Sequence, residues 1–313
     1  LAAGGFEGNQ AMREKHLPNT TRTEWSCANP HNTGDAIAMA QKLGAAVDLM
    51  SDAWWGPTTV VPDEGPARML VIEKSLPGSI LVNKVGERFV NEAAPYIDVV
   101  NAMHAKNSPE KPCVPAYLVF DASFRKKYPC GPILQASQQP DWALPRALKG
   151  YFKKADTLEG LAQQLGIDAK GLKESVRKLN EYAKTGEDLD FHRGETVFDR
   201  YYGDENVTPN PCLAPIETPP FYGLEAYPGE LGTKGGLKTD ASARVLRESG
   251  EAIPGLDAIG NCSASAMGHT YPGAGSTRKR WPVTNFLKVE AALKADGLTT
   301  EFILGPAEKS LID

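Results

Sequence analysis

The chain has 313 residues, of which 41% are hydrophobic and 23% are charged, as in an ordinary globular protein of about two domains. The net charge of −5 argues against a general affinity for nucleic acid, and the absence of an apolar run near ~20 residues argues against stable membrane insertion. The five cysteines are widely spaced and include no C-x-x-C pair, which disfavours a metal site and favours free thiols in a reducing, cytoplasmic location.

The sequence begins with residues 1–6, an apolar stretch that ends in two glycines and is typical of a buried strand running into a turn. Because a domain seldom starts inside a core strand, we expect the chain to be a fragment that lacks an upstream segment. Further on, Asp35 is a favourable N-cap for a helix over residues 36–43, and Gly44 is a favourable end for it. A short strand is expected at residues 45–48.

The middle of the chain alternates between loop-rich and strand-like segments. Residues 51–66 are rich in proline, glycine and tryptophan and indicate a crossing between domains. Residues 79–83 and 88–91 have the pattern of two strands in a hairpin, and residues 117–121 predict another strand. Residues 191–220 are expected to be mostly loop.

Two helices are predicted in the second half of the chain. The first spans residues 157–165, and Asp168 is expected to cap the second, which ends at Gly186. The apolar residues of the second helix recur at helical spacing: Leu172, Val176 and Leu179. The remaining predicted elements are two strands and a helix: residues 235–239, 243–246 and 285–295.

The C-terminal part contains the pattern that says most about chemistry. A short apolar run ends at Gly260 and Asn261, as a buried strand does where its backbone meets a ligand. Tyr271 and Gly275 follow in a loop, and a phenol and a backbone N–H at this spacing can both point at one carbonyl oxygen. Two such donors acidify the carbon beside a ketone, so the pattern indicates redox chemistry on a ketone. No G-x-G-x-x-G is present, and this dinucleotide-binding motif is expected in the missing upstream segment.

Several segments, taken in order, resemble a known group of proteins. They are residues 1–6, 32–35, 86–96, 235–237, 253–256, 260–261 and 268–275. Together they resemble the FAD-binding fumarate reductase/succinate dehydrogenase flavoprotein superfamily, and within it they are most similar to the 3-ketosteroid Δ1-dehydrogenase branch. The glycine segments occur throughout the superfamily, whereas the Pro-Tyr pair at 95–96 and His-Thr-Tyr-Pro-Gly at 269–273 are more specific.

The resemblance implies an α/β fold with FAD as cofactor. An incomplete, Rossmann-like FAD-binding domain is expected at residues 1–57 and 222–313, with an inserted α+β substrate (catalytic) domain at residues 58–221. Nine residues are implied to bind the cofactor: Gly4, Gly5, Gly34, Asp35, Gly260, Asn261, Ala274, Ser276 and Thr277. The alternative for Asp35 is helix capping alone, and the alternative for the Gly-Asn pair is a simple turn at a strand end.

The resemblance also implies three catalytic groups. Tyr96 resembles a general base that removes a proton from C2, while Tyr271 and the N–H of Gly275 polarise the C3 carbonyl and hydride passes from C1 to flavin N5. A tyrosine with a pKa near 10 is mostly neutral at pH 7, which costs about 4 kcal/mol before any proton moves. The alternative for Tyr96 is a half-buried tyrosine at a strand end. His269 is predicted to be a structural hydrogen-bonding residue rather than a base.

The expected partners are a 3-ketosteroid or similar cyclic ketone and an electron acceptor. A fumarate-reductase-like flavoprotein is the first alternative, and the His-Thr-Tyr-Pro segment at 269–272 disfavours it because dicarboxylate substrates need arginines. A non-catalytic remnant is the second alternative, because the FAD motif is absent and residues 278–282 read Arg-Lys-Arg-Trp-Pro instead of a small, apolar helix start. This departure puts the flavin-pyrimidine contacts in question.

Overall fold

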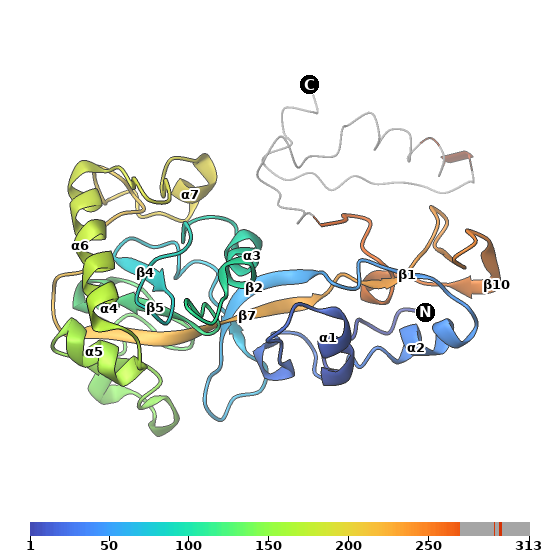
Figure 1. The fold of residues 1–313 in the computed structure, drawn as a ribbon, viewed down its shortest axis with the longest axis horizontal. Coiled ribbons are helices and arrows are strands. Elements are labelled where there is room, and N and C mark those ends of the chain that lie inside the picture. The colour runs from blue at the N-terminus through green and yellow to red at the C-terminus, as the bar shows by residue number, and fades with distance from the viewer. Residues whose placement is uncertain (270–290, 292–293, 296–313) are drawn as a thin grey trace. The chain divides into compact units, whose positions relative to one another are not determined.

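The computed structural model describes residues 1–269, 291 and 294–295, and residues 1–269 belong to one compact unit of mixed α and β structure (Figure 1). The helices of this unit are α1 (Gln10–His16), α2 (Asp35–Lys42), α3 (Tyr96–Lys106), α4 (Ala122–Lys127), α5 (Leu158–Leu165), α6 (Ala169–Thr185) and α7 (Val197–Tyr201). The strands are β1 (Val47–Asp48), β2 (Ala53–Thr59), β3 (Arg68–Met69), β4 (Ser79–Val82), β5 (Ala116–Phe120), β6 (Lys153–Ala155), β7 (Phe221–Thr233), β8 (Gly236–Leu237), β9 (Arg244–Leu246) and β10 (Ala252–Asp257).

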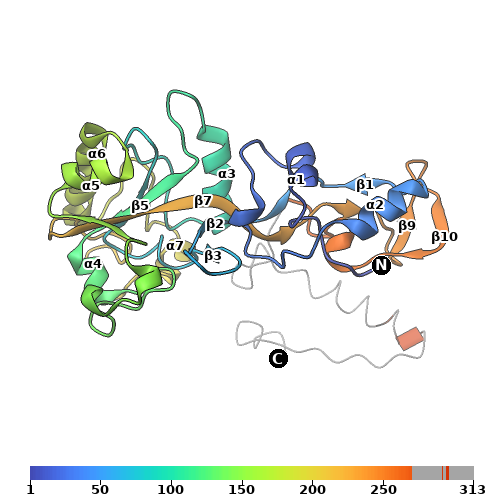
Figure 2. The same cartoon turned by 90° about the horizontal axis from the view of Figure 1, so that it is seen from below.

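The main sheet is built around β7, the longest strand among the described residues. Its path runs β3-β2-β7-β5-β4, with β6 also paired to β7, while β1 pairs with β8 and β9 with β10. Residues 222–226 of β7 pair with β5, and residues 227–233 pair with β2. All of these strand pairs are antiparallel. Figures 1 and 2 both show α4, α5 and α6 around the first part of β7 and α1 and α2 beside its last part.

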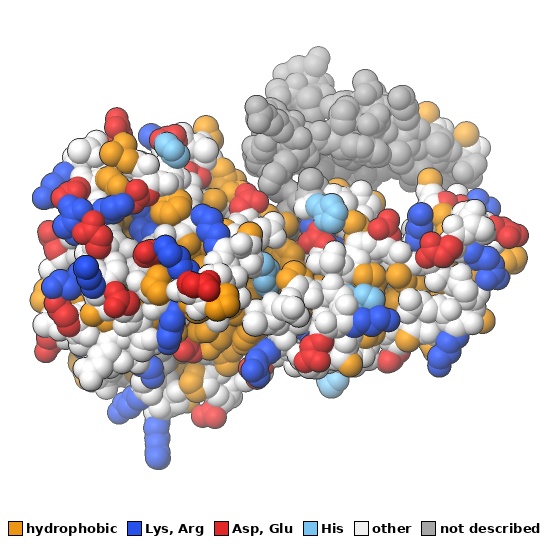
Figure 3. Space-filling view, in the orientation of Figure 1, with side chains coloured by type: hydrophobic (Ala, Val, Ile, Leu, Met, Phe, Trp, Pro, Cys, Tyr) orange, Lys and Arg blue, Asp and Glu red, His pale blue; other side chains and the backbone are white. Residues whose placement is uncertain are grey.

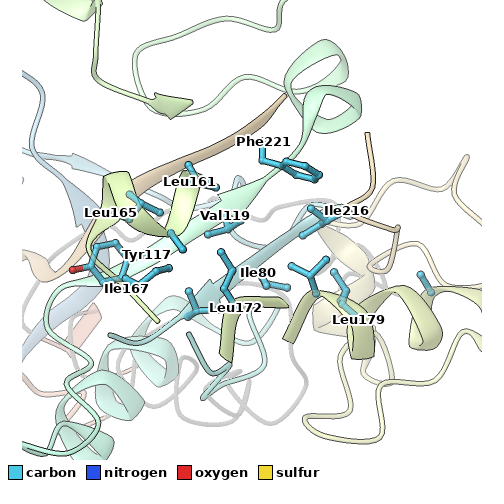
Figure 4. Packing of buried hydrophobic residues seen from close by; sticks show 14 of the residues in the cluster. Ile80, Tyr117, Val119, Leu161, Leu165, Ile167, Leu172, Leu179, Ile216 and Phe221 are labelled. Carbon is cyan, nitrogen blue, oxygen red and sulfur yellow. The ribbon is translucent and has the colours of Figure 1, made fainter. Parts of the chain in front are cut away.

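A cluster of buried hydrophobic side chains lies between α5, α6 and the β4–β5 pair. Leu172 and Leu179 of α6 point toward Ile80 and Val119 of the two strands (Figure 4), and all four are at most 1% exposed. Burying one such side chain contributes roughly 1.5–3 kcal/mol, so this face accounts for much of the stability of the sheet. The helical spacing of these residues in the sequence predicted the buried face of α6.

The predicted ends of α6 are confirmed, whereas Thr157, predicted as the first helical residue, is the N-cap of α5. Thr157 Oγ1 accepts a hydrogen bond from the N–H of Gly160 at 3.0 Å, and Asp168 Oδ1 accepts one from Gly171 at 2.6 Å. Gly186 ends α6 with a left-handed backbone, φ 83°. The strands predicted at 45–48, 117–121, 235–239 and 243–246 are confirmed as β1, β5, β8 and β9.

The predicted hairpin over residues 79–91 forms only in part. Strand β4 forms, but it pairs with β5, and the second predicted strand is reduced to a single bridge between Val82 and Arg88. The Arg88 side chain points inward and binds Glu92 and Asp188, and the chain after it continues into the loop before α3 instead of extending the ladder. The segment predicted as a domain crossing, 51–66, contains β2, which pairs with β3 and β7.

Two expectations for the N-terminal region are also corrected. Gly34, with φ 78°, is the N-cap of α2, and Asp35 is its first helical residue rather than its cap. The side chain of Asp35 instead accepts a hydrogen bond from Thr33 Oγ1 at 2.8 Å. Residues 1–3 are exposed and belong to no strand of the described structure, in contrast to the predicted strand. Most of the helix predicted at 285–295 lies outside the described residues.

The surface of the described residues carries mixed charge. On the face seen in Figure 3, basic and acidic side chains are interspersed rather than gathered by sign. Within this same part of the chain, no helix combines the length and the apolar character needed to cross a membrane.

Buried His104 on α3 leads to a prediction about pH. Its ring packs edge-on against Trp55 at 5.2 Å, its buried Nε2 has no hydrogen-bond partner among the described residues, and burial lowers its pKa to about 4. The folded chain therefore keeps this ring neutral, whereas the unfolded chain binds a proton below pH 6.5. The packing of the neutral His104 ring therefore contributes fully to the stability of the fold above pH 6.5. This contribution is lost as the pH falls toward 4, because proton binding then favours the unfolded chain.

We predict that His104→Phe, which keeps the ring contact, makes the chain less sensitive to acid. Between pH 6.5 and 4 the original chain should lose about 2–3 kcal/mol more of its free energy of unfolding than the variant does. Urea denaturation at a series of pH values measures this difference, and parallel pH curves for the two proteins would contradict the prediction.

Candidate functional site

Two glycine segments from opposite ends of the described chain meet in the structure. The N-terminal amine of Leu1 donates to the carbonyl oxygen of Asp257 at 2.6 Å, and the N–H of Ile259 donates to the carbonyl oxygen of Leu1 at 3.0 Å. The N–H of Gly34 donates to the carbonyl oxygen of Gly5 at 3.0 Å. These contacts bring the segments containing Gly4–Gly5, Gly34 and Gly260–Asn261 into one region, the glycine region.

A buried carboxylate joins the parts of the glycine region. Glu7 is 1% exposed, and its Oε1 accepts a hydrogen bond from Asn32 Nδ2 at 2.6 Å. Its Oε2 accepts hydrogen bonds from the N–H and Oγ1 of Thr233, at 3.2 and 3.0 Å. A Cβ placed on Gly232 would lie 2.6 Å from Asn261 Nδ2 and 3.7 Å from Glu7 Oε1, so Asn261 is also close. The sequence offered no local signal for Glu7, because its partners are distant in the chain.

The glycines of this region differ in what surrounds them. A Cβ on Gly5 would overlap Thr233 Oγ1 and Glu7 Oε2, and one on Gly34 would lie 2.8 Å from Phe6 Cβ. These two glycines are therefore required by the packing of the chain against itself. Gly260 has φ 67°, and no atom of the described residues lies within 4 Å of the position that its Cβ would take. Its backbone is thus open to approach by a ligand.

Tyr96 lies elsewhere in the fold, as the first residue of α3. Pro95 is the N-cap of this helix, and its fixed φ favours the start of a helix after an extended residue. The Tyr96 side chain is half-buried. Because Tyr96 lies at the N-terminus of a helix of 11 residues, the helix dipole stabilises the ionised form of its phenol by roughly 0.3–1 kcal/mol.

The loop before Tyr96 rests on a buried group of charges, which we call the ion cluster: Lys74, Arg88, Glu92, Asp188, Arg193 and Asp199. Arg88 Nη2 lies 2.7 Å from Glu92 Oε2 and 2.8 Å from Asp188 Oδ2. Arg193 Nη1 lies 3.1 Å from the same Glu92 oxygen. Burial opposes the charge on Arg88, but the two carboxylates outweigh it and raise the pKa of Arg88. Burial lowers the pKa of Lys74 to about 7, with a further contribution from Arg193.

A second ionic group lies at the end of β7. Asp52 Oδ2 is 3.3 Å from Lys234 Nζ and 3.0 Å from His269 Nδ1. Lys234 is 1% exposed, and its Nζ also lies 4.9 Å from the centre of the Trp54 ring. His269 therefore makes the kind of structural hydrogen bond predicted for it, and it lies two residues before Tyr271.

Five of the predicted site residues lie outside the described residues: Tyr271, Ala274, Gly275, Ser276 and Thr277. Of the others, the structure brings Gly4, Gly5, Gly34, Gly260 and Asn261 into the glycine region. Asp35 is exposed next to Gly34, at the start of α2.

A groove of about 1070 Å³ lies between the α1 region and the Val114–Pro115 turn. Its lining includes Arg22, Glu24 and Tyr227 and does not include Tyr96. We do not assign it to a substrate, because charged side chains open to solvent do not suit an apolar ligand. No group of His, Cys, Asp and Glu side chains among the described residues is arranged to hold a metal ion.

Comparison with known proteins identifies relatives of the chain. Residues 1–277 match a family described as FAD binding domain. The chain is 46% identical over 283 residues to a 3-oxosteroid 1-dehydrogenase from Mycobacterium tuberculosis, covering 88% of this chain and 49% of the relative. It is 40% identical over 284 residues to a 4-oxocyclohexanecarboxylate 2-dehydrogenase from Sinomonas cyclohexanicum, covering 88% of this chain and 48% of that relative. The chain thus spans about half the length of the curated relatives it matches.

The fold has a counterpart among solved structures. The crystal structure of 3-ketosteroid Δ1-dehydrogenase from Sterolibacterium denitrificans in complex with 1,4-androstadiene-3,17-dione matches with a TM-score of 0.84 at 49% identity. The match covers 94% of this chain and 52% of that chain. These findings confirm the resemblance predicted from the ordered glycine segments and the Pro-Tyr and His-Thr-Tyr-Pro-Gly elements.

The glycine region fits the cofactor that this family binds, FAD. The open backbone at Gly260 allows a polar chain such as a pyrophosphate to approach closely. The amide of Asn261 and the exposed carboxylate of Asp35 are suited to the hydroxyl groups of a ribose or ribityl chain.

We predict that Gly5→Ala damages the glycine region, whereas Gly65→Ala does not. A Cβ at Gly5 meets Thr233 and Glu7, while a Cβ at Gly65 meets no atom within 4 Å, and neither glycine has a left-handed backbone. Gly5→Ala should lower the free energy of unfolding by about 1–3 kcal/mol and weaken FAD binding. Urea denaturation and flavin titration measure both effects. Equal behaviour of the two variants would show that the packing at Gly5 is not constraining.

Proposed function

This chain belongs to the FAD binding domain family, and we propose that it forms part of an FAD-dependent 3-ketosteroid Δ1-dehydrogenase, which introduces a double bond next to a ketone. The observation that carries this proposal is the match to the solved 3-ketosteroid Δ1-dehydrogenase, at 49% identity over 94% of the chain. The 46% identity to a 3-oxosteroid 1-dehydrogenase supports the same substrate class. The reaction also requires an electron acceptor as a second partner.

The proposed domain division assigns residues 1–57 and 222–313 to a Rossmann-like FAD domain and residues 58–221 to an inserted α+β substrate domain. These boundaries fall within β2 and at the start of β7, so the two domains share a pair of antiparallel strands. Such a connection favours a fixed substrate site at the seam. The thiols of the five cysteines are free, which supports a reducing, cytoplasmic location.

The residues proposed to hold FAD are those of the glycine region together with Asp35, Ala274, Ser276 and Thr277. The N–H groups of the last three would face the flavin ring, as the family resemblance implies. When bound, FAD supplies the two-electron oxidant. The chain itself contributes the binding surface and the groups that handle the proton.

Tyr96 is proposed to take the proton from the carbon beside the ketone onto its phenolic oxygen. An ordinary phenol needs about 4 kcal/mol to ionise at pH 7, and the N-terminus of α3 returns only roughly 0.3–1 kcal/mol of this. Most of the barrier must therefore be lowered on the substrate. Tyr271 and the N–H of Gly275 are proposed to do so by donating hydrogen bonds to the carbonyl oxygen, which stabilises the enolate as it forms.

A smaller cyclic ketone is a second candidate substrate. The 40% identity to 4-oxocyclohexanecarboxylate 2-dehydrogenase favours it, since the same removal of hydrogen beside a ring ketone is named for that relative. Turnover of 4-androstene-3,17-dione and of 4-oxocyclohexanecarboxylate with an artificial electron acceptor distinguishes the two. Activity on fumarate alone would support the fumarate-reductase-like alternative and end the ketone proposal.

The assay begins with the flavin absorption spectrum of the purified chain. A chain without flavin would favour the non-catalytic remnant. The same assay on a fusion that supplies the part of the Mycobacterium tuberculosis relative not covered here then tests whether these residues support catalysis in a longer protein.

We predict that Tyr96→Phe lowers the turnover number by about 10²–10⁴-fold, because it removes the proton acceptor. The flavin content should not change. Tyr201→Phe is the matched control, since Tyr201 is 77% exposed on α7 and its loss should leave turnover unchanged. Steady-state kinetics with 4-androstene-3,17-dione measure the effect, and a Tyr96→Phe variant with near-normal turnover would exclude Tyr96 as the base.

A further inference from the structure

The loop that precedes Tyr96 is held by a buried lysine. Lys74 is 1% exposed, and its Nζ donates to the carbonyl oxygens of Glu92 at 2.9 Å and Ala94 at 2.8 Å. Its third acceptor is Ser75 Oγ at 3.2 Å. A lysine ammonium has three N–H donors, so these acceptors use all of them.

We propose that Lys74 is a positioning residue for Tyr96, because its ammonium fixes the carbonyl groups from which the chain enters α3. The inference rests on the proposed role of Tyr96 as the base. Ala94 lies two residues before Tyr96, with only the rigid Pro95 between them. The carbonyl oxygen of Pro95 then accepts the first helical hydrogen bond, from the N–H of Asp98 at 2.8 Å. A shift at Ala94 is therefore passed on to the start of the helix.

The lysine is itself attached to a fixed part of the fold. Arg193 is fully buried, and its Nη2 donates to the carbonyl oxygens of Ser75 at 3.1 Å and Leu76 at 2.8 Å. Its Nη1 donates to the carbonyl oxygen of Ser79 at 2.7 Å, at the start of β4. The segment carrying Lys74 is thus tied to the sheet, and Lys74 transmits this position to the loop before Tyr96.

The head group of Lys74 does more than fill space, because with a pKa near 7 it is partly protonated at neutral pH, and both the ammonium and the amine present N–H donors to these carbonyl groups. An uncharged side chain of similar length would occupy the same volume without the cost of burying an ammonium, which is several kcal/mol. That side chain would leave the carbonyl groups of Glu92 and Ala94 without their donor. The ammonium therefore contributes a defined geometry for the loop, at a cost in stability that Glu92 and Asp199 reduce by their charges.

The test compares Lys74→Met with Arg125→Met. Arg125 is a matched control: it is 2% exposed, and it donates to two loop carbonyl oxygens, of Leu134 at 2.7 Å and Gln139 at 2.6 Å. Both variants lose a buried cation that holds a loop. Amide hydrogen exchange, measured on the chain itself, and steady-state kinetics of the flavin-loaded protein are the two readouts.

Lys74→Met should speed exchange at residues 93–99 about tenfold or more and leave residues 134–143 unchanged. It should lower kcat by about 10–100-fold with KM for the ketone within about twofold, because a displaced base slows the proton transfer and not binding. Arg125→Met should speed exchange at residues 134–143 and leave kcat within about twofold of the original. Should Lys74→Met not fold, Lys74→Gln, which keeps part of the donor set, replaces it, with the same pattern expected at smaller size.

Unchanged exchange at residues 93–99 would overturn the inference even in a fully active enzyme, as would kcat losses of equal size in the two variants. Failure of the proposed function looks different. In that case the original protein turns over no ketone, although the exchange at residues 93–99 still responds to the loss of Lys74.

Discussion

The ion cluster is the constraint on which the proposed substrate domain depends. Three cations, Lys74, Arg88 and Arg193, and three carboxylates, Glu92, Asp188 and Asp199, are each at most 8% exposed. Removing one buried partner typically costs 3–5 kcal/mol, because the remaining charge is left uncompensated. The residues come from segments up to about 125 positions apart, so these segments reach their final places only together.

The ion cluster binds backbone groups as well as side chains. Arg193 and Lys74 donate to carbonyl oxygens in loops that lack the regular bonding of a helix or strand. Such carbonyl groups must find donors when they are buried, and a cation supplies several donors from one point. The irregular chain between β4 and α3 can therefore be buried and rigid at once, which suits a segment that carries a proposed base.

The glycine region is organised differently, because buried side chains bind the end of β7. Arg13 forms a fully buried ion pair with Glu230, at 2.7 Å, and Glu7 binds the backbone and side chain of Thr233. Since the first part of β7 pairs with β5, this one strand connects the glycine region with the sheet beneath α5 and α6. The positions of the two proposed binding surfaces are thus coupled through continuous backbone.

Local patterns in the sequence predicted the elements that local forces decide. The cap Asp168 and the stop at Gly186 are confirmed, because a cap acts within four residues of itself. The prediction of Asp35 as a cap is wrong, because the cap position packs against Phe6 and needs a left-handed backbone, which suits Gly34. The local sequence does not reveal this contact with Phe6.

The candidate site was predictable only in part, for the same reason. The order of the glycine segments identified the family, and with it the cofactor. Glu7, Lys74 and Arg193 were missed because the partners of a buried charge can lie anywhere in the chain. The partner of Arg88, Asp188, is likewise 100 residues away, so the local pattern at 88–91 does not display this contact.

The described structure contributes to the proposed reaction mainly through geometry. The helix end at Tyr96 offers at most about a quarter of the roughly 4 kcal/mol that an ordinary phenol needs to ionise at pH 7. A rigid loop, in contrast, can supply several kcal/mol by keeping a base at the correct distance, since well-oriented groups react as if highly concentrated. Burying six ionisable side chains beside this loop costs free energy of folding, but their hydrogen bonds fix the conformation of the loop. This cost is consistent with a reaction whose rate depends more on the position of the proposed base, Tyr96, than on its basicity.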